Sequence, residues 1–226
     1  MASARASCYR EKRTPAILHK LQPKVRMFLR RRLAIFALLV ASAVATAAVN
    51  NVSKSASAAD AAAAQALLKQ ARVDSRPSDF AAEVKAIAAI QRQVLAAAPI
   101  DKDIAVDRPR ELTDMLQLGH GLCYDRSRSI ETVLNVAGFT TRHAAIYALP
   151  ADSAAPLKAL ITPGNRSHAL TEVKTSRGWM LVDSNRPWLG LANNGKPIDL
   201  QDLAEMDHRK LVGSPDEIFD QPFTWV

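Results

Sequence analysis

Three stretches before residue 119 carry apolar residues at helical spacing. The Ala-rich stretch 61–73 predicts one helix, because alanine has the highest helix propensity. After Pro77, Ser78 can cap a second helix whose apolar face is formed by Phe80, Val84, Ile87, Val94 and Leu95. Asp107 can cap a third, short helix that presents Leu112, Met115 and Leu116. We interpret the first two as packing helices and the third as the lead into the segment that follows.

A fourth helix is predicted over residues 123–137, behind a loop flanked by Gly119 and Gly121. Its apolar residues recur at helical spacing until Gly138 supplies a stop; they are Ile130, Val133, Leu134 and Ala137. Cys123 therefore lies in the first turn, where free backbone N–H groups and the helix dipole lower a thiol pKa. This is a suitable position for a nucleophile, although a lone cysteine can also be a small buried hydrophobe.

Beyond Gly138 the pattern becomes strand-like, over residues 140–149, 167–175 and 179–183. The last two strands predict a hairpin about Ser176-Arg177-Gly178, so the fold class is α+β, with the Cys123 helix packed on an antiparallel sheet. If Thr175 pairs with Gly178, His168 and Asp183 share one face as diagonal neighbours, roughly 7 Å apart at Cα. A shift of the strand pairing by one residue would put the two side chains on opposite faces of the sheet. The length of the turn is left open.

The N-terminal region predicts export. Arg30, Arg31 and Arg32 precede residues 33–49, a run of 17 residues without charge, which is the lower limit for a membrane-spanning helix. Ala45-Thr46-Ala47 fits a signal-peptide cleavage site, and a start at Met27 would give a signal peptide of ordinary length. We expect a cleaved signal peptide or a membrane anchor, with the rest of the chain periplasmic or otherwise outside the cytoplasmic membrane.

The charge distribution argues against nucleic-acid binding. The net charge is +8, but residues 1–32 hold ten basic residues and one acidic residue, whereas the remainder holds 20 basic and 21 acidic residues. We divide the chain into a basic cytoplasmic arm (1–32), the membrane-targeting segment (33–49), a linker with the Ala-rich helix (50–76) and one domain (77–226). Besides Cys8 in the arm, Cys123 is the only cysteine, so the exported part can form no internal disulfide.

Three blocks in this order resemble the transglutaminase-like superfamily. They are Gly121-Leu122-Cys123, His168-Ala169-Leu170-Thr171-Glu172-Val173 and Trp179-Met180-Leu181-Val182-Asp183. The resemblance covers about residues 116–185 and implies a papain-like core over the domain. It also implies a catalytic triad with Cys123 as nucleophile, His168 as base and Asp183 as the residue that orients the histidine. Leu170 stands where members often carry an aromatic residue, and near the cysteine only Asp125 is acidic.

Such a triad supports attack on an amide through a thioester intermediate. Gln117 is a candidate oxyanion donor beside the Cys123 backbone N–H, and Trp179 and Trp188 are candidates to line a substrate cleft. His120 and His143 have no partners at metal-ligand spacing, so we expect no metal and no other cofactor.

Three functions remain open at this point. The first is a cysteine peptidase or amidase that acts on a protein or peptide substrate in the cell envelope. The second is an acyltransferase of transglutaminase type, in which an amine replaces water. The third is a non-catalytic module for envelope assembly or binding, which is disfavoured because all three triad residues are present. The substrate and the oligomeric state are not predicted.

Overall fold

The computed structural model describes residues 23–49, 55–105, 108–149, 158, 160, 162–205 and 223–225. The chain divides into two compact units, residues 1–53 and 54–226. Most of the basic arm, residues 50–54 of the predicted linker and the predicted cap Asp107 lie outside the described residues.

The first unit contains one described helix, α1 (Pro23–Val49), which includes the whole charge-free run. Its large apolar side chains, among them Leu33, Phe36 and Leu39, are exposed within this unit. No helix in the described part of the chain is both long enough and apolar enough to span a bilayer.

The second unit opens with the helices that the hydrophobic pattern predicts. They are α2 (Ala58–Ala71), α3 (Phe80–Ala97), α4 (Leu112–Leu118) and α5 (Cys123–Val136). The cap of α3 is Asp79, whose side chain accepts from the Ala82 N–H at 2.9 Å, so the prediction of Ser78 is wrong by one residue. Helix α4 begins after Glu111. Helix α2 buries Leu67 and Leu68 in the core, so the folded unit begins before residue 77.

Four strands form one antiparallel sheet in the order β3-β2-β1-β4. Their bounds are β1 (Thr140–Ala148), β2 (Ser167–Thr175), β3 (Gly178–Asp183) and β4 (Phe223–Trp225). Thr175 pairs with Gly178 across a two-residue turn, which is the register that places His168 and Asp183 on one face. The α+β class and the antiparallel hairpin are therefore confirmed.

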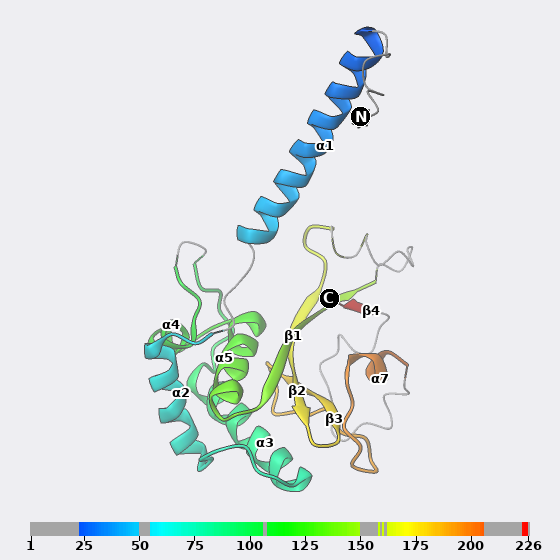
Figure 1. Ribbon diagram of the computed structural model, residues 1–226. Coiled ribbons are helices and arrows are strands. Elements are labelled where there is room, and N and C mark those ends of the chain that lie inside the picture. Colours follow the sequence, from blue (N-terminus) through cyan, green and yellow to red (C-terminus); the bar gives the residue numbers. More distant parts are fainter. Residues whose placement is uncertain are drawn as a thin grey trace, which may run out of the picture. The chain divides into compact units, whose positions relative to one another are not determined.

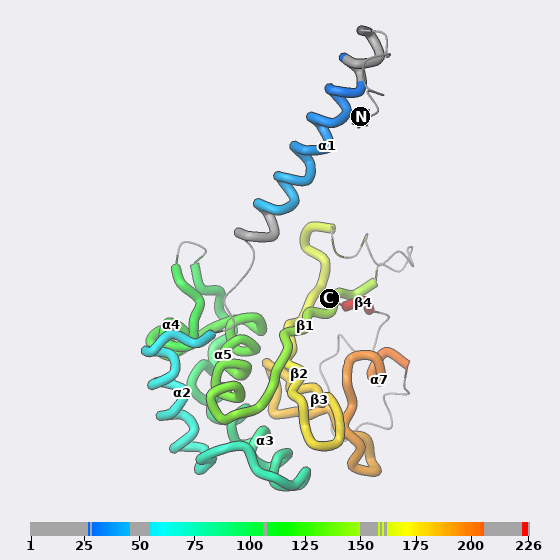
Figure 2. The backbone as a smooth tube through the Cα atoms, viewed as in Figure 1, coloured from blue at the N-terminus to red at the C-terminus, as the bar shows by residue number. Residues whose placement is uncertain are grey.

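Apolar side chains cover both faces of this sheet. On one face, Val173, Met180 and Val182 join the core formed with α2, α3 and α5. On the other, Leu170 and Leu181 pack with Trp188 and with residues of α7 (Leu200–Glu205). Figure 1 shows α2, α3 and α5 on one side of the strands and α7 on the other. Along the tube in Figure 2 the helices, cyan to green, precede the yellow hairpin.

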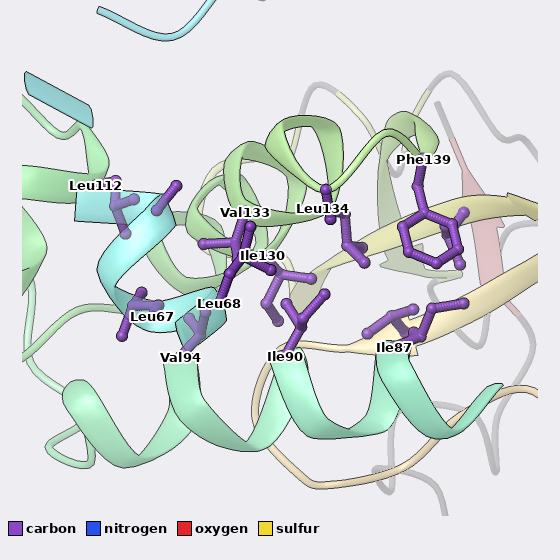
Figure 3. Packing of buried hydrophobic residues seen from close by; sticks show 14 of the residues in the cluster. Leu67, Leu68, Ile87, Ile90, Val94, Leu112, Ile130, Val133, Leu134 and Phe139 are labelled. Carbon is purple, nitrogen blue, oxygen red and sulfur yellow. The ribbon is translucent and has the colours of Figure 1, made fainter. Parts of the chain in front are cut away.

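The helical core fixes the position of α5. In Figure 3, Ile87, Ile90 and Val94 of α3 point toward Ile130 and its neighbours on α5. These side chains are fully buried. Burial of each contributes about 1.5–3 kcal/mol, so the start of α5 is held in place by the packing of its middle.

A buried carboxylate ties the β2–β3 turn to α3. Glu83 accepts from the N–H and the hydroxyl of Ser176, both at 2.7 Å, and pairs with Arg76 at 2.6 Å. Burial alone would raise the pKa of Glu83, but the bonds from Ser176 and Arg76 hold it below its ordinary value. The charged form is therefore the one that the folded state favours.

We expect Glu83→Ala to lower the free energy of unfolding by roughly 2 kcal/mol, because it removes the hydrogen bonds that Ser176 and Arg76 donate to the buried carboxylate. Urea unfolding followed by circular dichroism measures this change. Glu205→Ala, at an exposed position of α7, serves as the matched control and should change stability by less than about 0.5 kcal/mol. Equal midpoints for the two variants would contradict the assignment.

Candidate active site

Cys123 is the first residue of α5 and is half-buried. Asp125 accepts from the Leu122 N–H at 2.9 Å and is paired with Arg110 at 2.9 Å. Gly121 allows this close turn, since a Cβ there would lie 2.9 Å from the Cβ of Asp125. The loop and the first turn of α5 are thus locked together just before the thiol.

His168 and Asp183 face each other as the hairpin register predicts. Nε2 of His168 lies 3.1 Å from Oδ2 of Asp183, and both side chains are almost fully buried. Asp183 pairs with Leu170 across the sheet, so the histidine and the aspartate are diagonal neighbours. The pair is thus formed by residues of two neighbouring strands of the sheet.

The end of β3 explains how the thiol reaches the histidine. The Ala148 N–H donates to the Arg166 carbonyl, and hydrogen-bonded pairs alternate along antiparallel strands. The backbone groups of even-numbered residues of β2 therefore bond to β1, and those of odd-numbered residues point toward β3. Because β3 ends at Asp183, Ala169 lies beyond its last pair. Its carbonyl accepts from the Ser184 hydroxyl at 2.6 Å, and its N–H donates to the Cys123 sulfur.

Cys123 and His168 share a hydrogen bond, and each shifts the pKa of the other. Burial alone would raise the pKa of the Cys123 thiol, but His168 and the N–H groups of Ala169 and Tyr124 lower it below its ordinary value. Burial would lower the pKa of His168, but the hydrogen bonds and charges of Asp183 and Cys123 raise it to about 9. Both shifts favour a thiolate beside an imidazolium.

Asp183 also organises the turn that follows β3. Its Oδ1 accepts from the backbone N–H groups of Asn185 at 2.6 Å and Arg186 at 2.8 Å. From α3, the buried amide of Gln91 donates to the carbonyls of Asp183, Arg186 and Trp188, at 2.7 to 2.9 Å. The aspartate is therefore fixed through both of its oxygens and through its backbone.

Arg126 and Asn185 are site residues that the sequence analysis missed. Arg126, one turn after Cys123, is 4% exposed and donates to the Ser184 carbonyl at 2.9 Å and to Oδ1 of Asn185 at 2.7 Å. This bond fixes the orientation of the Asn185 amide, whose Nδ2 lies 3.4 Å from Nδ1 of His168. The only available signals were an arginine at helical spacing from the cysteine and an amide two residues after the aspartate.

The three remaining candidates do not gather around the thiol. Gln117 is exposed on α4 and lines a pocket with Arg108 and Asp114 that contains no triad residue. Trp179 lies at the far end of β3, where Arg142 stacks on its ring at 4.4 Å. Trp188 is 5% exposed and belongs to the core under α7, so its prediction as a cleft residue is wrong.

The other two histidines in the described part of the chain have separate environments. His120 faces the Lys102 carbonyl at 3.2 Å, and His143 lies on β1, 3.4 Å from both Ser127 and Glu131. Among the described residues, no group of three or more His, Cys, Asp or Glu side chains could hold a metal ion.

Residues 76–184 match the family model described as the transglutaminase-like superfamily. No curated protein and no solved structure matches the chain. The matched range runs from the residue before Pro77 to the residue after Asp183, so it contains Cys123, His168 and the paired strands. This agrees with the α+β fold and confirms the resemblance that the three sequence blocks indicate. Residues 76–184 therefore form a domain of the transglutaminase-like superfamily, whose members are generally thiol-dependent enzymes.

Proposed function

We propose that this chain is an enzyme that acts on amide or isopeptide bonds through a thioester on Cys123. The observation that carries the proposal is the unbroken series of contacts from the Cys123 thiol through the His168 imidazole to the Asp183 carboxylate. The opposite pKa shifts of the thiol and the imidazole support it, because a nucleophile and its base need this pairing at neutral pH.

Each proton has a defined path in the proposed reaction. Asp183 holds Nε2 of His168, so Nδ1 is the nitrogen that takes the Cys123 proton. The thiolate attacks the carbonyl carbon, and the oxyanion is met by the backbone N–H of Cys123. His168 then returns its proton to the leaving amine, the C–N bond breaks and the thioester remains. Gln117 has no part in this scheme, because its pocket contains no triad residue.

Hydrolysis and acyl transfer differ in the second step. In a hydrolase, His168 takes a proton from water, which attacks the thioester and releases an acid. In an acyltransferase, an amine takes the place of water and a new amide forms. The triad serves both, so the products formed with and without an added primary amine distinguish them.

The first test is the reactivity of Cys123 toward iodoacetamide at pH 6. We expect mass spectrometry to find Cys123 alkylated in the folded protein at least tenfold faster than in the urea-unfolded chain, where a free thiol of pKa about 8.5 is almost wholly protonated. The Cys123→Ser variant is the control for the assignment of the adduct. Equal rates in the folded and unfolded chains would favour the alternative function, a non-catalytic module for envelope assembly or binding.

We propose further that the domain acts outside the cytoplasmic membrane. The support is the change from three arginines to the 17-residue charge-free run, together with the nearly neutral remainder of the chain. A reporter active only after export should give signal when fused after Val226, and one active only in the cytoplasm should not. The reverse pattern would rule out export.

A further inference from the structure

A pocket of about 760 Å³ shares two residues with the hydrogen-bond network that reaches the triad, although it contains no triad residue. Arg126 and Asn185, which form the network that reaches His168, both line this pocket. Its walls come from the second half of α3, the segment after α3 and the turn after β3. Neither Cys123 nor His168 lines it, so it adjoins the reacting atoms as a separate compartment.

The polar lining of the pocket is mostly guanidinium. Three arginines, Arg92, Arg126 and Arg186, line the pocket together with one carboxylate, that of Asp101, which pairs with Arg126 at 2.7 Å. The exposed side chains of Arg92 and Arg186 have no carboxylate partner among the described residues. This local excess of positive charge contrasts with the nearly neutral composition of residues 33–226.

Hydrogen bonds from buried side chains hold the backbone that carries Arg92 and Arg186. Gln91 is 1% exposed and bonds the Arg186 carbonyl at 2.9 Å, which anchors the turn to the residue that precedes Arg92 in α3. Arg126 fixes the adjacent Asn185 side chain and, at 3.3 Å, the Ala98 carbonyl. The pocket is therefore built on hydrogen-bonded backbone, and the exposed residues Arg92 and Arg186 add positive charge to its lining.

Apolar atoms form the rest of the lining. Leu95, Ala96, Pro99 and Pro187 offer aliphatic surface between the charged groups. A guanidinium binds a carboxylate by two parallel hydrogen bonds, and the aliphatic surface suits a methylene chain. We propose that this pocket binds the carboxylate of a substrate whose acidic group is joined by a short aliphatic chain to the amide attacked by Cys123. This assignment of substrate class rests on the proposed function.

The proposal can be tested with matched alkylating agents. N-bromoacetyl ω-amino acids of increasing chain length carry the reactive carbon and a carboxylate, and their primary amides differ only in charge. In a Cys8→Ser background at pH 8.5, where any accessible thiol reacts, we expect the acid of one chain length to alkylate Cys123 about tenfold faster than its amide. The carboxylate should act by lowering the reagent concentration that gives the half-maximal rate of alkylation.

The variants Arg92→Gln and Arg186→Gln, alone and combined, should reduce the rate with the acid toward that with the amide and leave the amide rate unchanged. Arg108→Gln removes the same charge from a different pocket and should preserve the preference. An acid-to-amide ratio near one at every chain length, or a ratio that the double variant leaves intact, would overturn the proposal.

This experiment separates the pocket from the triad. A preference for the acid at pH 8.5 depends on the arginines and does not require an activated thiol. Reactivity with iodoacetamide at pH 6 depends on His168 and does not require the pocket. If the preference for the acid depends on the arginines but Cys123 reacts like a free thiol, the proposed function is overturned, and with it the assignment of a substrate. The pocket would then remain as a carboxylate-binding site.

Discussion

In the His168→Ala variant, alkylation of Cys123 by iodoacetamide at pH 6 is expected to be on the order of 100-fold slower than in the wild type. Without the imidazolium, the thiol loses its hydrogen bond and the charge that stabilises the thiolate. A thiol of pKa about 8.5 is less than roughly 1% ionised at this pH. The residual N–H bonds from Ala169 and Tyr124 keep the loss below the full difference in ionisation.

The matched control for this variant is His143→Ala. His143 lies on the neighbouring strand β1 and contacts Ser127 and Glu131 rather than the thiol. Rates measured from pH 5 to 10 should superimpose on the wild-type profile for this control, whereas His168→Ala should follow the profile of a free thiol. If both variants follow the wild-type profile, Cys123 and His168 are not coupled.

The coupling of His168 to Cys123 and Asp183 also sets the pH above which turnover declines. The pKa of His168 is raised to about 9, so the imidazolium persists at neutral pH and loses its proton as the pH rises through that value. Above it, His168 cannot protonate the leaving amine. Turnover of an amide substrate should therefore decline above pH 9, even though the thiol remains ionised there.

Asp183→Asn is expected to lower amide turnover by about 10⁴-fold, the loss seen when the orienting carboxylate of another triad is replaced by its amide. The structure fixes how the new amide must sit. Oδ1 receives the N–H groups of Asn185 and Arg186, so the amide oxygen takes this position and the NH₂ group takes that of Oδ2. The NH₂ group then donates to Nε2 of His168, which moves the ring proton to Nδ1.

An imidazole with its proton on Nδ1 cannot accept the proton of the thiol. The defect should therefore appear in kcat, with KM changed much less, because the carboxylate does not contact substrate in the proposed scheme. Asp202→Asn, at an exposed position on α7, is the matched control and should retain full turnover. If Asp183→Asn kept wild-type kcat, Asp183 would have no role in orienting His168.

The relation between His168 and Asp183 could be predicted because it depends only on local chemistry. Two residues, Ser176 and Arg177, separate the strands, and the period of two along each strand then decides the shared face. The start of α5 was predictable for a similar reason, since two glycines precede an amphipathic run. Local reasoning failed at two helix caps, because Asp79 rather than Ser78 caps α3 and Glu111 rather than Asp107 caps α4.

What could not be predicted depends on contacts between distant segments. Trp188 follows Asp183 by five residues, and the turn held by Gln91 directs its ring into the core under α7. Arg126 lies in a helix whose pattern marks arginine as a surface residue, yet two backbone carbonyls and Asn185 receive its donors. The spacing of apolar and polar residues along the chain does not indicate such a partner.

The two roles of Asp183 affect which substitutions this protein could accept during evolution. One oxygen serves the chemistry and the other folds the turn after β3, whereas the thiol of Cys123 is half-buried and only its reaction requires sulfur. A descendant that abandoned catalysis could exchange the cysteine for serine at little cost in stability, but it would have to keep the aspartate. The aspartate is thus a marker of the architecture, and the cysteine is the marker by which active and inactive descendants could be told apart.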